Sequence, residues 1–132
     1  MPPQIVHLIA AARPNFMKVA PLWHALAAAP DFAPVLVHTG QHYDANMSEI
    51  FFEQMAIPKP NYHLGVGGGS HGAMTGRQLE KIEEVLVAEK PDWVVVQGDT
   101  TSAFCASLAA FHRRIAVAHV EAGLSSFDRR HP

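Results

Sequence analysis

The fold is decided by residues 93–101, which read Trp93-Val94-Val95-Val96-Gln97-Gly98-Asp99-Thr100-Thr101. An unbroken run of apolar, mostly β-branched residues is typical of a strand that is covered on both faces in a parallel sheet. The strand is expected to end before Gly98, and Thr100 or Thr101 is suited to cap a helix that extends to about Phe111. We therefore expect this strand to be a central strand of the sheet.

The same switch between short strands and helical stretches recurs on both sides of this segment. We expect strands at about 4–10, 34–38, 61–64, 92–97 and 115–120, and helices from Pro14 onward and at about 46–55, 74–89 and 100–111. Five strands joined by right-handed helical crossovers predict an α/β fold, namely a Rossmann-like doubly wound parallel sheet.

Apolar residues at helical spacing indicate which side of each expected helix faces the sheet. These are Phe16, Val19, Ala20, Trp23, Leu26 and Ala27 in the first helix, Ile50, Phe51 and Met55 in the second, and Leu79, Ile82, Leu86 and Val87 in the third. Pro21 interrupts the first helix, because a proline inside a helix removes a backbone hydrogen bond. We therefore expect that helix to bend at Pro21 or to begin late.

Composition excludes several classes of protein. The 132 residues are 48% hydrophobic, which suits one globular domain, and 10 basic against 12 acidic residues leave no positive field for nucleic acid. The single cysteine, Cys105, excludes an internal disulfide and is interpreted as a packing residue. The absence of a targeting signal and of an apolar run of about 20 residues predicts a cytoplasmic protein with no membrane partner.

Polar residues follow the expected strands where they end. They are Arg13, Lys18, Gln41, His42, Asp99, Thr100 and Glu121. Taken singly, Asp99 could cap a helix, and Arg13 or Lys18 could be a solvated charge. Because ligands bind at the carboxyl ends of the strands in open parallel sheets, the set together favours a ligand-binding site over a purely structural role.

Two other patterns in the sequence are weak evidence for a metal site or a dinucleotide site. His119 and Glu121 share one face of a strand, but no third metal ligand is placed beside them, so a core histidine is favoured over a metal site. The glycine-rich run at 65–72 matches the spacing of a dinucleotide fingerprint but lies in the wrong part of the fold, so the match is weak. We interpret this run as a mobile loop, with Ser70 and His71 as secondary polar candidates.

Four ordered motifs resemble the non-hydrolysing UDP-N-acetylglucosamine 2-epimerases. They are Ala11-Ala12-Arg13-Pro14-Asn15-Phe16-Met17-Lys18-Val19-Ala20-Pro21, Thr39-Gly40-Gln41-His42, Gln97-Gly98-Asp99-Thr100-Thr101-Ser102-Ala103 and His119-Val120-Glu121-Ala122-Gly123-Leu124. Asn15 and Ser125 replace the family's usual glutamate and arginine, which leaves the identity of the UDP-sugar open. The glycine-rich run is more similar to the branch that acts on UDP-2,3-diacetamido-2,3-dideoxyglucuronate.

The resemblance implies that the chain is the N-terminal half of a glycosyltransferase-B-like two-domain fold, without the C-terminal domain that holds most of the UDP. It implies an isomerase that inverts carbon 2 of a UDP-sugar by eliminating and re-adding UDP, with no cofactor and no metal. By the same resemblance, Asp99 and Glu121 are catalytic, whereas Arg13, Lys18, Gln41, His42 and Thr100 bind substrate. A homodimer is implied for the full-length protein, and the isolated chain is expected to be inactive.

Two other functions are compatible with this sequence. One is an interaction module that keeps the Rossmann-like fold without any chemistry. The other is a glycosyltransferase-B domain that transfers the sugar to an acceptor instead of inverting it. An epimerase is expected to exchange the hydrogen on carbon 2 of the sugar with solvent, whereas a transferase or a binding module is not.

Overall fold

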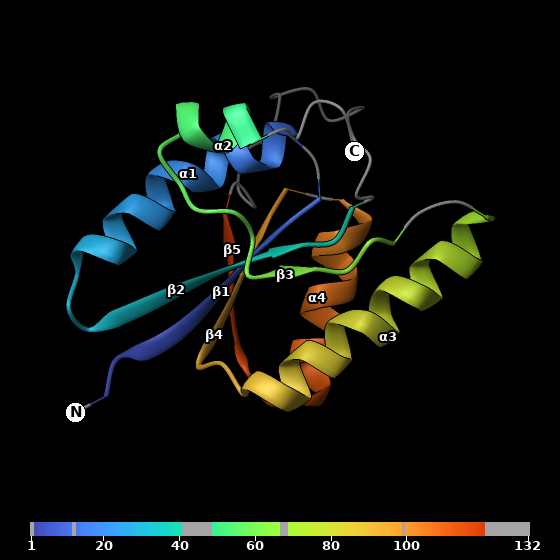
Figure 1. Cartoon of the computed structure of the whole chain (residues 1–132). Coiled ribbons are helices and arrows are strands. Elements are labelled where there is room, and N and C mark those ends of the chain that lie inside the picture. The colour runs from blue at the N-terminus through green and yellow to red at the C-terminus, as the bar shows by residue number, and fades with distance from the viewer. Residues whose placement is uncertain (1, 12, 41–48, 67–68, 99, 121–132) are drawn as a thin grey trace, which may run out of the picture.

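The computed structural model describes residues 2–11, 13–40, 49–66, 69–98 and 100–120 (Figure 1). Its strands are β1 (Gln4–Ala10), β2 (Phe32–His38), β3 (Tyr62–His63), β4 (Trp93–Gln97) and β5 (Ala116–Val120). Its helices are α1 (Arg13–Ala28), α2 (Glu49–Gln54), α3 (His71–Glu89) and α4 (Thr101–His112). The alternation of strand and helix that the sequence predicts is confirmed.

The five strands form one parallel sheet in the order β3-β2-β1-β4-β5. In this order β1 lies in the middle and pairs with β2 from Gln4↔Phe32 to Ala10↔His38 and with β4 through Leu8↔Val95. The chain moves outward from β1 to β3, crosses back through α3, and moves outward again from β4 to β5. This is the doubly wound topology, so the predicted fold class is confirmed.

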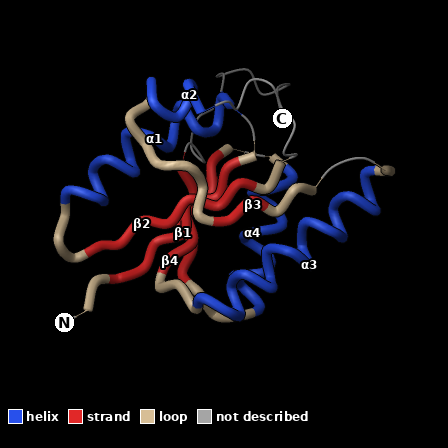
Figure 2. Tube along the Cα trace, in the orientation of Figure 1, coloured by secondary structure: helices blue, strands red, loops and turns tan. Residues whose placement is uncertain are grey.

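The sheet lies between two pairs of helices (Figure 2). Because neighbouring residues of a strand point to opposite faces, Leu8 contributes to the core under α1 and α2, whereas Ile9 contributes to the core under α3 and α4. In the same way Val95 faces the first core, and Val94 and Val96 face the second. Strand β4, which lies between β1 and β5, is therefore apolar on both faces, as its sequence predicts.

Two helix boundaries differ from the prediction. Helix α3 begins at His71, three residues before the expected start, because the Ser70 hydroxyl accepts a hydrogen bond of 3.1 Å from the Ala73 amide and caps the helix. Ser70 is therefore a helix cap, and His71 belongs to the helix instead of a loop. Helix α1 begins at Arg13 and continues through Pro21, so the expected late start is wrong.

Three residues expected to face the sheet lie on the surface. Ile50 is 63% exposed and Val87 is 41% exposed, and Ala27 is exposed as well. Val87 follows Ile82 by five residues, which places it about 140° around the helix, and the buried residue is Val85 instead. In the short helix α2 the buried pair is Phe51 and Phe52. The rings of Phe52 and Phe16 pack edge to face, with their centroids 5.5 Å apart.

Candidate functional site

The described ends of four strands meet at one edge of the sheet. The backbone N–H of Thr39 donates to the carbonyl of Ala10 at 2.9 Å, and the N–H of Gly98 donates to the carbonyl of Val120 at 3.1 Å. These bonds continue the pairing of β1 with β2 and of β4 with β5 just beyond the strands. Helices α1 and α4 begin at this edge, and the free N–H groups at the start of a helix favour an anion.

Two glycines allow the chain to be this compact at the edge. A Cβ atom on Gly40 would lie 2.5 Å from the carbonyl oxygen of Ala11, so a side chain does not fit there without a shift of the backbone. Gly98 has a φ of 71°, in the left-handed region that glycine adopts at little cost. The turns that follow β2 and β4 therefore both require glycine.

The structure describes three of the seven predicted site residues in part or in full. Thr100 is the N-cap of α4, and its hydroxyl accepts a hydrogen bond of 3.1 Å from the Ala103 amide. Lys18 is an exposed residue of α1, and Arg13 is the first residue of the same helix. The predicted residues outside the described part of the chain are Gln41, His42, Asp99 and Glu121.

Asn15 connects the start of α1 to the end of β4. Its Oδ1 accepts a hydrogen bond of 3.1 Å from the Ala11 N–H, and its Nδ2 donates one of 2.7 Å to Oε1 of Gln97. Gln97 directly precedes Gly98 and the predicted catalytic residue Asp99. Asn15 therefore connects the first of the four motifs to the third.

A second connection is fully buried. The Thr39 and Ser102 hydroxyl oxygens lie 2.7 Å apart, and Ser102 donates to Oε1 of Gln78 at 2.8 Å. The three side chains are at most 6% exposed. They join the end of β2, the first turn of α4 and the middle of α3.

Two histidines lie beside Gly40. His38 is buried, and its Nδ1 accepts a hydrogen bond of 2.9 Å from the Gly40 N–H. The rings of His38 and His63 have centroids 4.2 Å apart, and His63 Nε2 donates to the Gly40 carbonyl at 3.2 Å. Both polar groups of the Gly40 backbone are thereby bonded to imidazoles, which fixes the turn that leads toward Gln41.

Sequence reasoning missed Asn15, Gln78, Thr39 and Ser102 as residues that organise this edge. One signal was present for Gln78. It precedes Ile82 by four residues and Leu86 by eight, so it occupies the apolar stripe of α3, where a polar residue indicates a buried hydrogen bond. The other three residues make contacts across long sequence separations that no local pattern contains.

His119 is not the core histidine that the sequence favours. Its side chain is exposed on the edge strand β5, and its Nε2 bonds to the carbonyl of Gly98. No three His, Cys, Asp or Glu side chains are grouped to hold a metal ion among the residues that the structure describes. Cys105 is buried, as predicted for a packing residue, and this burial raises the pKa of its thiol.

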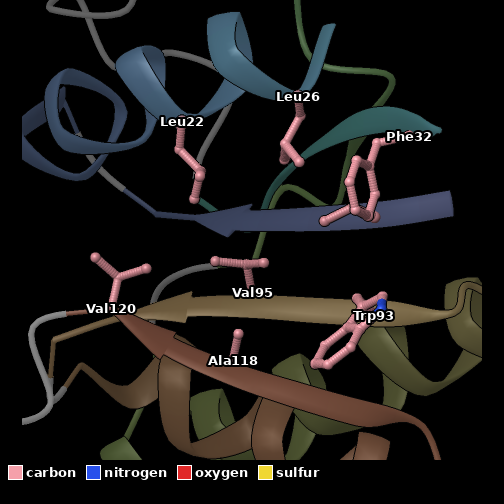
Figure 3. Close-up of a pocket in the computed structure, with 8 residues that line it drawn as sticks. Leu22, Leu26, Phe32, Trp93, Val95, Ala118 and Val120 are labelled. Atoms are coloured by element: carbon pink, nitrogen blue, oxygen red, sulfur yellow. The ribbon is translucent and has the colours of Figure 1, made fainter. Parts of the chain in front are cut away.

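The described residues form an apolar pocket of about 220 Å³ between α1 and the β4–β5 pair (Figure 3). Leu22 and Leu26 point into it from α1 toward the sheet, as Figure 3 shows. From the sheet it is lined by Trp93, Val95, Ala118 and Val120, among others. A pocket without charged side chains is unsuited to a nucleotide diphosphate, so the candidate site is the polar edge instead.

None of the helices in the described ranges is long and apolar enough to span a membrane.

Comparisons with known proteins agree with the four motifs. The profile of the UDP-N-acetylglucosamine 2-epimerase family matches residues 24–132. The chain is 52% identical to the UDP-2,3-diacetamido-2,3-dideoxy-D-glucuronate 2-epimerase of Pseudomonas aeruginosa over 94% of its own length and 35% of that protein. It is 48% identical to the UDP-N-acetylglucosamine 2-epimerase of Methanocaldococcus jannaschii over 95% of its own length and 34% of that protein.

The fold agrees as well. The crystal structure of the Methanocaldococcus jannaschii enzyme in complex with UDP-GlcNAc and UDP superposes with a TM-score of 0.84 at 47% identity, covering 96% of this chain and 34% of that one. The chain thus spans about a third of the length of the relatives that it matches. Because the family profile matches far more than half of its residues, the chain belongs to the UDP-N-acetylglucosamine 2-epimerase family.

Proposed function

We propose that residues 1–132 form a single Rossmann-like domain, the N-terminal domain of a UDP-sugar 2-epimerase. The observation that carries the proposal is a 52% identical relative with this named activity, of which the chain covers 35%. A C-terminal domain that closes over this one in a glycosyltransferase-B-like arrangement is then the main partner. The protein that contains both domains is called the full-length epimerase.

The polar edge suits the diphosphate of a UDP-sugar. Helices α1 and α4 both begin there, and the partial positive charge at a helix N-terminus favours bound phosphate. We assign Arg13, the first residue of α1, and Lys18, in its second turn, to the phosphates, because charged donors hold phosphate oxygens most strongly. Gln41, His42 and Thr100 are assigned to substrate binding at the same edge.

The proposed reaction breaks and remakes two bonds. A base removes the proton from carbon 2 while the bond between carbon 1 and the UDP oxygen breaks, which leaves UDP and a glycal-like intermediate. UDP then returns to carbon 1, and an acid delivers a proton to the opposite face of carbon 2. Asp99 and Glu121 are the carboxylates that we assign to this proton transfer. Arg13 and Lys18 stabilise the charge on the departing UDP.

Two sugars are candidates for the substrate. The Pseudomonas aeruginosa relative acts on a diacetamido-glucuronate, and the Methanocaldococcus jannaschii relative acts on UDP-N-acetylglucosamine, as their names state. The similar identities, 52% and 48%, do not separate the two. We propose the diacetamido-glucuronate first, since the glycine-rich run is more similar to that branch.

Exchange of the hydrogen on carbon 2 tests the proposed function. The full-length epimerase is incubated in D₂O with each UDP-sugar, and proton NMR follows the signal of the hydrogen bound to carbon 2. We expect this signal to disappear and the epimer to appear with one of the two sugars. Transfer of the sugar to an acceptor without exchange would indicate a glycosyltransferase instead, and binding of partner proteins with neither reaction would indicate an interaction module.

The 132-residue chain alone provides a second test. A cleft between two domains excludes water and orients the diphosphate only when both walls are present. We therefore expect the isolated chain to be inactive and to bind UDP more weakly than the full-length epimerase does, as titration calorimetry would show. Turnover at a similar rate by the chain alone would contradict the two-domain site.

We further propose that the full-length epimerase is a homodimer. Phe104 and Phe111 support an interface on α4, because they are 61% and 75% exposed and lie seven residues apart on one side of the helix. Apolar side chains this exposed are common where proteins associate. Light scattering should give the mass of a dimer, and Phe111→Asp should reduce it to that of the monomer.

A further inference from the structure

Three buried polar side chains form a continuous chain of hydrogen bonds behind the candidate site. Thr39, Ser102 and Gln78 are 1%, 4% and 6% exposed, and they come from the end of β2, the first turn of α4 and the middle of α3. The oxygen-to-oxygen distances are 2.7 Å from Thr39 to Ser102 and 2.8 Å from Ser102 to Gln78. Both distances are typical of hydrogen bonds donated by a hydroxyl group.

The direction of each bond follows from the chemistry of the groups. Ser102 donates its single hydroxyl hydrogen to Oε1 of Gln78, which is an acceptor. Thr39 must then donate to Ser102, because Ser102 has no second hydrogen to give. Such a chain holds its members in one arrangement, since an unpaired buried hydroxyl or amide is costly.

The position of this chain of hydrogen bonds relates it to the proposed reaction. Thr39 precedes Gln41 by two residues, and Ser102 follows Asp99 by three. The bond between Thr39 and Ser102 therefore joins residues that lie next to two segments to which we assign substrate-binding and catalytic residues, and the bond from Ser102 to Gln78 connects both to α3. None of the three side chains is exposed enough to contact a substrate.

We propose that Thr39, Ser102 and Gln78 are positioning residues, which fix the segment carrying Asp99 against the segment carrying Gln41 for proton transfer at carbon 2. This inference rests on the proposed function. A small displacement of a catalytic group lowers the rate about 10- to 100-fold without removing any contact to the substrate. Loss of the hydrogen-bond chain should therefore lower kcat far more than it weakens the binding of UDP.

A pair of substitutions at Thr39 separates positioning from stability. Thr39→Val keeps the volume of the side chain and loses the hydrogen bond, and it leaves the bond from Ser102 to Gln78 intact. Thr39→Ser keeps the hydroxyl and loses a methyl group. In the full-length epimerase we expect Thr39→Val to lower kcat at least tenfold with the Kd for UDP within about threefold, whereas Thr39→Ser should retain kcat within about threefold.

A second variant removes the bond from Ser102 to Gln78 together with both of its partners, so that the Thr39 hydroxyl is the one member of the hydrogen-bond chain left without its bond. Ser102→Ala combined with Gln78→Leu replaces two bonded groups with apolar ones, which is less destabilising than removing one partner alone. The double variant is expected to show the same loss of kcat as Thr39→Val. Ile82→Val is the matched control, since Ile82 is buried one turn further along α3 and its loss of one methylene should lower the Tm but leave kcat unchanged.

The outcomes distinguish this inference from the proposed function. If the unmodified full-length epimerase neither exchanges the hydrogen on carbon 2 nor binds UDP, the proposed function fails and the inference falls with it. If the unmodified protein is active and Thr39→Val retains kcat within twofold, the inference alone is overturned. It is also overturned if kcat falls only in proportion to the Tm across all the variants, including Ile82→Val.

Discussion

The side-chain amide of Asn15 donates a hydrogen bond of 2.7 Å to the side-chain oxygen of Gln97, although the two residues lie 82 positions apart in the chain. Asn15 also accepts a bond from the Ala11 N–H at 3.1 Å. We expect Asn15→Ala to lower the free energy of unfolding by about 1–2 kcal/mol, because both partners lose a hydrogen bond in a partly buried region. Urea unfolding of the 132-residue chain would measure the loss.

Asn15→Asp provides the comparison for this prediction. The carboxylate can still accept from Ala11, and the Gln97 amide can rotate to donate to it. The loss of stability should therefore be smaller than for Asn15→Ala. Equal losses in the two variants would show that the hydrogen bonds of residue 15 with Ala11 and Gln97 contribute little to stability.

The two proposed catalytic carboxylates lead to a kinetic prediction. In the full-length epimerase, Asp99→Asn and Glu121→Gln should each lower kcat by about 10²–10⁴, the usual effect of removing a positioned acid or base. The Tm should change little. Steady-state kinetics and thermal unfolding of the same preparations would measure both quantities.

A purely structural role for Asp99 predicts the opposite pattern. If the Asp99 carboxylate only organises its turn, Asp99→Asn should lower the free energy of unfolding by up to about 1 kcal/mol and leave turnover almost unchanged. Near-normal kcat in both carboxylate variants would remove the acid/base assignment.

The two proposed phosphate ligands should behave differently from the carboxylates. Arg13→Ala and Lys18→Ala are expected to raise the Kd for the UDP-sugar and to lower kcat as well, because the diphosphate is charged in both the ground state and the transition state. Titration with UDP and steady-state kinetics would separate the two effects. An unchanged Kd for UDP in both variants would rule out contact with the phosphates.

The order and type of the elements could be predicted because each depends on local periodicity. The unbroken apolar run at Val94–Val96 and the helical spacing of Ile82 and Leu86 are visible within a few residues of sequence, and both proved correct. The prediction for Ile50 was wrong because α2 is only six residues long, less than two helical turns, so its inward face is set by contact with α1 and not by a repeated helical pattern.

The organisation of the candidate site could be predicted only in part. The sequence shows which residues follow each strand. Because parallel strands end at a common edge of the sheet, those residues can be expected to lie close together. It does not indicate that Thr39 bonds to Ser102, since the two lie 63 positions apart and their contact depends on how α4 packs on the sheet. The roles assigned to Asp99 and Glu121 remain predictions.

The burial of His7 leads to the prediction that the free energy of unfolding decreases at acidic pH. Its ring is completely buried under the end of α3, with Nε2 3.8 Å from the Glu89 carboxylate of α3 and its centroid 6.3 Å from the Tyr62 ring of β3. Burial lowers the pKa of His7 below 6.5, although the nearby carboxylate partly opposes this effect. In the folded protein His7 is therefore neutral at pH values where the unfolded chain is protonated.

The sign of the effect follows from this difference in proton binding. Well above pH 6.5 neither state holds a proton on His7, and the contribution of His7 to stability is at its maximum. As the pH falls below 6.5, the unfolded state binds the proton first, so the free energy of unfolding decreases by up to about 1.4 kcal/mol per pH unit until the folded state is protonated too. Urea unfolding at several pH values should show a shallower decrease for His7→Leu. The same pH dependence in both proteins would exclude His7 as its source.

The apolar pocket under α1 leads to a prediction about stability. Ala118 lines this pocket from β5 opposite Val95, and a valine there would add two methyl groups to an apolar space and favour the strand. We expect Ala118→Val to raise the free energy of unfolding of the 132-residue chain by about 1 kcal/mol. Ala116→Val is the matched control, because Ala116 lies on the same strand and face but is exposed opposite Trp93. A larger rise in Tm for Ala118→Val would show that filling the pocket stabilises the fold, whereas equal rises would indicate that strand propensity alone is responsible.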